Sequence, residues 1–314
     1  MKPIKALPVV SILLLAGCFP SLQGSPPEAP SPTVTANALE VTRVSSDSRV
    51  EFAPRLSPNG EWLLYSAYDP SVSGPRAYSI VAISPKGGAQ RPIAGPGAVW
   101  GTWFPDSRNI VYVSLLGDRP ILVRTTAGGV GTTFITNNPL GGFDEQPDVS
   151  PDGRVIAFHT YLQGRYVLAS VNIDGTSPTI YVPGTSPRWH PSGKKLVFDR
   201  LVDGKWHIFT LDLESGQVTQ LTSGRHNNAF PSWSPDGKWL TFQSDREGNY
   251  QVYIMKEDGT AVTQITKGEG AAVEPNWGSD GYIYFSSTFG NVNFEKREEW
   301  RAADIWRVKP KLPE

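Results

Sequence analysis

The chain has 314 residues, of which 39% are hydrophobic and 19% charged, and its formal net charge is −1. This composition is typical of a globular protein with a sizeable core, and without any Lys/Arg run it excludes a strongly basic nucleic-acid-binding surface. The single cysteine excludes an intramolecular disulfide and a cysteine-based metal site. The 31 Gly, 28 Pro and ten Trp favour tight turns between short, aromatic-rich strands.

The first 17 residues have the pattern of a secretory signal, with Lys2 and Lys5 followed by an apolar run over 7–15. The run is shorter than the ~20 residues that span a bilayer. It ends Leu15-Ala16-Gly17-Cys18, which is typical of a lipobox and predicts that Cys18 carries diacylglycerol and that its freed amine carries a further chain such as palmitate. The alternative is an ordinary signal peptide in which this cysteine is a coincidence. Because Phe19 rather than Asp follows Cys18, we expect an exported protein anchored to the outer membrane, facing the periplasm, if the cell is Gram-negative.

Residues 18–38 are rich in Pro and Ser. Proline restricts the backbone and disfavours compact structure, so this segment is predicted to be an extended tether. The domain that follows is predicted to cover residues 39–314.

One short phrase recurs six times in that domain. The proline of its turn, replaced by Ser279 in the last copy, recurs at steps of 47, 46, 40, 44 and 44 residues, which is the spacing of propeller blades. A Ser-Pro-Asp-Gly sequence is a tight turn, because Pro presets φ and Gly accepts the left-handed conformation. The copies are Pro54–Gly60, Thr102–Ser107, Pro147–Gly153, Pro187–Gly193, Pro231–Gly237 and Pro275–Gly281, and the tryptophans predicted to wedge between neighbouring blades are Trp103, Trp189, Trp233 and Trp277.

Each turn is followed by an alternating strand, then by a third and a fourth, so every repeat predicts one four-stranded blade. The last repeat ends after Asp304–Val308 and lacks an outer strand, whereas Leu39–Val44 has the pattern of one. We therefore predict an all-β fold: a six-bladed β-propeller of four-stranded blades in which the N-terminal strand closes the last blade and removes an exposed edge.

The segment 231–254, Pro-Ser-Trp-Ser-Pro-Asp-Gly-Lys-Trp-Leu-Thr-Phe-Gln-Ser-Asp-Arg-Glu-Gly-Asn-Tyr-Gln-Val-Tyr-Ile, resembles the WD-like propeller repeat of the TolB family. The resemblance covers residues 39–314. It implies a non-enzymatic scaffold in cell-envelope assembly that binds a protein partner. TolB proteins carry an α/β domain before the propeller; here we expect a lipid anchor and a short tether in its place.

The motifs of common enzymes are missing from the sequence. There is no Gly-x-Ser-x-Gly, His-Glu-x-x-His, phosphate loop or dinucleotide fingerprint. The histidines fall in four separate strands or turns, at no metal-binding spacing. Two alternatives stay open: a channel-site enzyme such as an oligosaccharide lyase, and a sensor module that binds a small ligand or Ca²⁺. The histidines are His159, His190, His207 and His226.

Two surfaces are candidates for partner binding, and no catalytic residue or cofactor is predicted. The first is an acidic and aromatic rim at one mouth of the central channel, formed by the segments that enter the inner strands. The second is the insertion 288–303 of the last repeat, with the charged run 295–299; insertions in repeat proteins often mark a binding face. The alternatives are ordinary solvated loops and a loop that covers the closure. The rim residues are Glu51, Trp100, Asp144, Glu145, His226, Asn227, Asn228 and Glu274, and those of the insertion are Phe289, Phe294 and Trp300.

Overall fold

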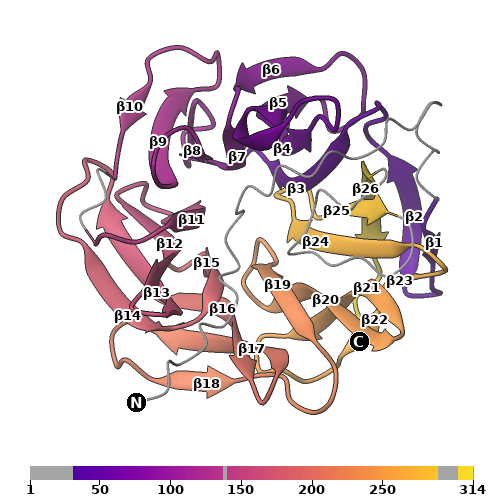
Figure 1. Ribbon diagram of the computed structural model, residues 1–314. Helices are drawn as coiled ribbons and strands as arrows, with labels where there is room; N and C mark the ends of the chain where they lie inside the picture. The colour runs from indigo at the N-terminus through magenta and orange to yellow at the C-terminus, as the bar shows by residue number, and fades with distance from the viewer. Residues whose placement is uncertain (1–30, 137–139, 289–302, 314) are drawn as a thin grey trace, which may run out of the picture.

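A computed structural model describes residues 31–136, 140–288 and 303–313 of the protein. The regular secondary structure of the described residues is β-strand, apart from one short 3-10 helix, η1 (Gly74–Ala77). Small sheets are arranged in a ring around a common centre, and the first strand of each repeat lies innermost (Figure 1). This is the arrangement of an all-β propeller, as the repeat spacing predicts.

Repeats two to five each form one four-stranded antiparallel sheet, and within each sheet the strands are neighbours in chain order. This order follows from short turns between consecutive strands. The sheets are β7 (Ala98–Trp103), β8 (Asn109–Ser114), β9 (Ile121–Thr126) and β10 (Thr133–Phe134); β11 (Asp144–Val149), β12 (Val155–Leu162), β13 (Arg165–Asn172) and β14 (Thr179–Pro183); β15 (Thr185–Trp189), β16 (Lys195–Val202), β17 (Lys205–Asp212) and β18 (Val218–Gln220); and β19 (Asn228–Trp233), β20 (Trp239–Glu247), β21 (Asn249–Lys256) and β22 (Thr263–Gln264).

The first and last repeats differ from this pattern, because they share one eight-stranded sheet. The six sequence repeats predict six separate four-stranded sheets. The difference arises where the ring closes: Ala303 and Val50 form a single parallel bridge that joins the two repeats. The strands of this sheet are β24 (Ala271–Trp277), β25 (Ile283–Thr288), β26 (Ala303–Pro310), β3 (Val50–Leu56), β4 (Leu63–Tyr68), β5 (Tyr78–Ile83) and β6 (Arg91–Ala94), with β2 (Ala38–Arg43) paired to β26.

The predicted closure by the N-terminal strand is present. β2 runs antiparallel to β26, with Val41 opposite Val308, and the amide of Val44 donates to the carbonyl of Ile305 at 2.8 Å. A further strand, β1 (Thr33–Val34), pairs with β23 (Thr266–Lys267) of the fifth repeat. The ordered fold therefore begins before residue 39, within the segment assigned to the tether, because this segment has β-sheet partners.

The repeated turns have the predicted chemistry. In the third repeat, the hydroxyl of Ser150 donates to Asp152 at 2.6 Å and accepts from the amide of Val155 at 3.0 Å. Gly153 has a φ of 73°, the left-handed conformation that only glycine adopts without strain. The side chain of Ser150 thus holds the turn between the first and second strands.

Tryptophans that precede the repeated turns link neighbouring sheets. The indole N–H of Trp103 donates to the carbonyl of Arg55 at 3.0 Å, and that of Trp189 donates to the carbonyl of Asp148 at 3.2 Å. Each bond joins a tryptophan to the inner strand of the preceding repeat. This confirms for these two residues that the tryptophans wedge between neighbouring repeats.

Candidate functional site at the central channel

The inner strand of every repeat contains one residue with positive φ, at the same repeat position. The register of the inner strand against the second strand shifts at this point in all six repeats. Such β-bulges redirect side chains, and here five of the six bulge residues line one small cavity. The residues are Ala53, Trp100, Gln146, Ser186, Phe230 and Glu274, with φ between 50° and 53°.

A small cavity lies where these strands converge. Its volume is about 10 Å³, room for about one water molecule. The lining combines aromatic rings, two arginines and one carboxylate, which suits polar recognition beside apolar contact. The lining residues are Ala53, Arg55, Trp100, Gln146, Arg188, Phe230, Pro231, Glu274 and Pro275.

The two arginines each follow the proline of a repeat. Arg188 is buried, and Nη1 donates to the carbonyl of Pro187 at 2.7 Å; Arg55 Nη1 donates to the carbonyl of Pro54 at 3.1 Å. Burial lowers the pKa of Arg55, opposed by the charges of Asp148 and Glu274. The centre of the ring therefore holds guanidinium groups that are taken out of bulk water.

Asp148 holds the same repeat position as these arginines. Burial raises its pKa to about 7, although the hydrogen bond from the Trp189 amide at 2.8 Å and the charge of Arg55 act in the opposite direction. This carboxyl group changes charge near neutral pH.

The backbone amides of five of the six bulge residues donate hydrogen bonds to side chains. Four of the accepting side chains lie on the second strand of the preceding repeat. Because each bond joins neighbouring repeats, the set fixes the position of one repeat against the next. The bonds are Trp100 N to Ser66 Oγ at 2.9 Å, Ser186 N to His159 Nδ1 at 3.3 Å, Phe230 N to Asp199 Oδ2 at 2.8 Å, Glu274 N to Gln243 Oε1 at 2.7 Å, and Ala53 N to Glu274 Oε2 at 2.8 Å.

Of the eight residues predicted to form a rim, the structure brings only Trp100 and Glu274 to the cavity. Glu51 is fully buried and accepts hydrogen bonds from Ser45 and, at 3.3 Å, from Gln90. Burial, and next the negative charge of Asp47, raise its pKa to about 8. Glu51 is therefore a buried polar group at the ring closure rather than a solvent-facing rim residue.

The acidic pair of the third repeat is also buried. Asp144 is 1% exposed, and burial raises its pKa. Glu145 Oε2 lies 3.4 Å from His159 Nε2. Both residues lie on β11 and are buried there, so they do not form a solvent-facing rim.

The remaining three rim residues form a separate polar cluster where β19 begins. Asn227 donates to Asp245 through its amide at 2.8 Å and its side chain at 2.7 Å, and Asn228 Oδ1 accepts from Arg246 at 2.9 Å. His226 Nδ1 lies 3.8 Å from Asp245. Asn227 also accepts from the amide of Trp206 in the fourth repeat at 3.1 Å, and the cluster contributes no residue to the cavity lining.

Sequence reasoning missed Arg55, Gln146, Arg188 and Phe230. A signal for the arginines was present, because the residue at this position is polar in every repeat. These residues are Arg55, Thr102, Asp148, Arg188, Ser232 and Asn276. Without the bulges, however, period-two alternation does not indicate which of these side chains face the centre.

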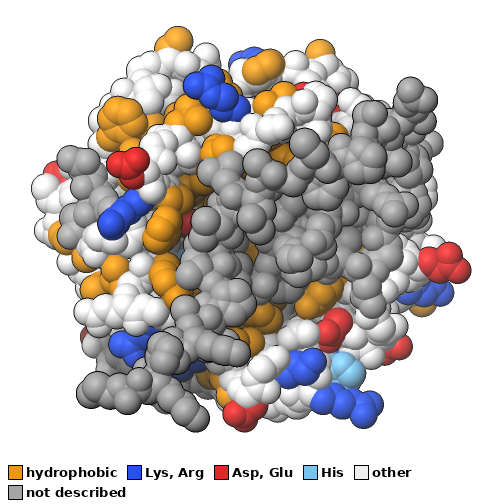
Figure 2. All heavy atoms as spheres, viewed as in Figure 1, with side chains coloured by type: hydrophobic (Ala, Val, Ile, Leu, Met, Phe, Trp, Pro, Cys, Tyr) orange, Lys and Arg blue, Asp and Glu red, His pale blue; other side chains and the backbone are white. Residues whose placement is uncertain are grey.

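Cys18 and the insertion residues Phe289, Phe294 and Trp300 lie outside the described residues. Within the described ranges, no helix is long and apolar enough to cross a membrane, and no three His, Cys, Asp or Glu side chains are grouped to hold a metal ion. On the face shown in Figure 2, described charged side chains of both signs are scattered around the perimeter, as the near-zero net charge predicts.

Comparison with known proteins agrees with an all-β propeller. The family model of the TolB beta propeller domain matches residues 178–300. Dipeptidyl-peptidase 5 of Porphyromonas gingivalis is 35% identical over 145 residues, which are 41% of this chain and 21% of the enzyme. An uncharacterized protein of Agrobacterium fabrum is 31% identical over 138 residues, 40% of this chain and 43% of that protein. The chain thus spans less than half the length of these curated relatives.

Solved structures show the same fold. A putative TolB from Agrobacterium tumefaciens superposes with a TM-score of 0.63 at 16% identity, covering 90% of this chain and 100% of that chain. TolB from Acinetobacter baumannii gives 0.63 at 19% identity, covering 81% and 65%. An oligogalacturonate lyase from Vibrio parahaemolyticus gives 0.57 at 11% identity, covering 90% and 96%. Together with the family match, these structures support a TolB-like propeller.

Proposed function

We propose that the protein is an exported, lipid-anchored propeller scaffold that binds a protein or peptide partner at the mouth of its central channel, as part of cell-envelope assembly. The observation that carries this proposal is the convergence of Trp100, Phe230, Arg55, Arg188 and Glu274 at the centre of the ring. Aromatic residues and arginine dominate the binding energy of protein interfaces.

The proposal includes a ring of six blades. Each of the six sequence repeats supplies one inner strand with a bulge, and the eight-stranded sheet corresponds to two blades, β3–β6 and β24–β26 with β2. This count gives every repeat four strands. A blade completed by the two ends of the chain leaves no open edge at the closure.

The size of the cavity supports a partner at the mouth rather than a small ligand enclosed there. Ligand pockets commonly measure ~300–1,000 Å³, whereas this cavity measures about 10 Å³. A loop or chain end of a partner can contact the central side chains from the mouth. The match to the TolB propeller domain over residues 178–300 supports the same class of function.

Site-specific photo-crosslinking tests this proposal. A photoreactive side chain at position 100, in the channel, should give a discrete adduct with one envelope protein in intact cells. The matched control places the same group at Phe134, on the outer strand β10, where the side chain is 67% exposed. No adduct at position 100, or the same adduct at both positions, would contradict binding at the channel mouth.

A further inference from the structure

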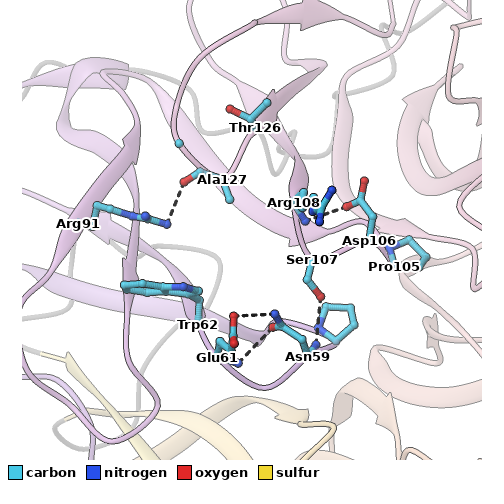
Figure 3. A pocket seen from close by; sticks show the side chains of 12 residues that line it. Asn59, Glu61, Trp62, Arg91, Pro105, Asp106, Ser107, Arg108, Thr126 and Ala127 are labelled. Atoms are coloured by element: carbon cyan, nitrogen blue, oxygen red, sulfur yellow. Dashed lines mark hydrogen bonds between the residues drawn. The ribbon is translucent and has the colours of Figure 1, made fainter.

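A second cavity opens between the first two repeats and shares no lining residue with the central cavity (Figure 3). Its volume is about 840 Å³, within the range of ligand-binding pockets. One wall carries Trp62 and Arg91 of the first repeat. The other is formed by the second repeat, from the turn 105–108 and the end of β9. We call this space the inter-repeat cleft.

The acidic residues of the inter-repeat cleft are occupied by their own neighbours. Glu61 accepts from the side chain of Asn59 at 2.8 Å. Asp106 accepts from the backbone amides of Arg108 and Asn109, at 2.8 and 2.9 Å, and holds the turn. Oxygen atoms of both carboxylates thus already accept hydrogen bonds from residues of the same turn.

The two arginines are placed differently. The guanidinium of Arg91 lies 4.3 Å from the ring centroid of Trp62 and donates to the carbonyl of Ala127 at 3.0 Å, so its plane is fixed. Arg108 is exposed, and its side chain makes no hydrogen bond or ion pair with any residue in the described part of the chain. The cleft therefore presents one preorganised and one uncommitted guanidinium group, and an Arg–carboxylate contact is a strong, charge-assisted one.

In the fifth repeat, an extended segment packs against the core cluster that contains the corresponding tryptophan. Trp239 holds the repeat position of Trp62: the amides of both bond to the turn serine, at 2.9 and 3.0 Å. Trp239 is only 7% exposed and belongs to a core cluster against which Val34 of β1 packs. There, an extended segment of the chain itself lies on the fifth repeat.

Trp62, in contrast, is only half-buried and faces the inter-repeat cleft. We propose that this cleft binds an extended peptide segment with acidic side chains. Its apolar side chains contact the Trp62 wall, and its carboxylates bind Arg91 and Arg108. The partner class is an acidic peptide, and the site is separate from the channel mouth.

Fluorescence anisotropy with two labelled peptides, Thr-Val-Glu-Val-Glu-Thr and its Gln-for-Glu counterpart, tests the proposal on the full chain at about 50 mM salt, where charge screening is weak. The acidic peptide should bind ~10-fold more tightly than the neutral one, a difference expected of charge-assisted contacts. Equal affinities, or no saturable binding of the acidic peptide, would overturn the proposal.

Variants of Arg108 locate the binding. Arg108→Gln should weaken binding of the acidic peptide ~5-fold, whereas Arg108→Lys, which keeps the charge, should retain most of the affinity. Both variants should fold, because the side chain is exposed. The matched control is Arg154→Gln, an exposed arginine at the same repeat position in the third repeat, which should leave affinity unchanged. An Arg108→Gln protein that binds as tightly as the wild type excludes this cleft.

Discussion

At the scale of single residues, one hydrogen-bonding role is filled by chemically different side chains. Ser66, His159, Asp199 and Gln243 each lie on a second strand, opposite the residue that precedes a bulge. Each accepts a hydrogen bond from the bulge amide of the next repeat. What these residues share is an acceptor atom, because a buried amide left without one destabilises the fold by about 1–3 kcal/mol.

Asp199 allows a test of this role. Burial raises its pKa to about 6, against hydrogen bonds from Thr185 and the Phe230 amide that favour the ionised form. A carboxyl whose pKa is higher in the folded than in the unfolded state stabilises most below pH 3.8, and this contribution is lost as pH rises through 6.

Asp199→Asn keeps an oxygen acceptor for the Phe230 amide but cannot ionise. Relative to wild type, we expect its free energy of unfolding to rise by about 2 kcal/mol between pH 4.5 and 7.5, measured by urea denaturation. Asp199→Ala, which removes the acceptor, should be destabilised at both pH values. A difference between Asn variant and wild type that stays constant with pH would refute the proposed titration.

At the scale of elements, the inner strands share a bulge and the ring is closed by a strand distant in sequence. β2 packs Val41 against the core cluster that contains Trp306 and Val308 of β26. β1 adds a contact with the fifth repeat. The N-terminal segment thus links two neighbouring repeats, the fifth through β1 and the last through β2.

Deletion of residues 39–45 should therefore destabilise the whole ring, because β26 keeps β25 but loses its outer partner β2 and the apolar contacts of Val41. We expect the melting temperature to fall by about 10 °C, as for a loss of several kcal/mol in a domain of this size. Deletion of 19–25, from the predicted tether, is the control and should leave the melt unchanged. Equal melting temperatures for the two deletions would contradict the role of β2.

At the scale of the whole molecule, the fold proposed here is a closed ring held at a membrane by its N-terminus. The anchoring prediction depends on Cys18 and the three residues before it. Two acyl chains hold a protein stably at a membrane, whereas one chain binds only marginally.

Cys18→Ala should release a folded protein from the membrane fraction, because no acyl chain can be attached. Fractionation followed by immunoblotting measures the distribution, and the melting temperature should match that of the wild type. Cys18→Ser, a second variant without a thiol, is expected to behave in the same way. A variant that still sediments with membranes would show that another part of the chain anchors it.

Several features were predictable from the sequence alone, because each depends on local chemistry repeated along the chain. The turn residues, the alternating strands and the tryptophans recur with a period that specifies an all-β propeller, and the unmatched strand at each end predicted the closure of β2 on β26. These signals need no knowledge of distant contacts.

The candidate sites were decided by tertiary structure. The bulges determine which side chains reach the centre, and for that reason Arg55 and Arg188 line the cavity whereas Glu51 and Asp144 are buried in sheets. The bridge between Ala303 and Val50, which joins the first and last repeats, likewise depends on how the ring closes. The cavity lining and the closing bridge both bring together residues that are far apart in the chain. The repeat pattern therefore specifies the blades but not the surfaces that form where the blades meet.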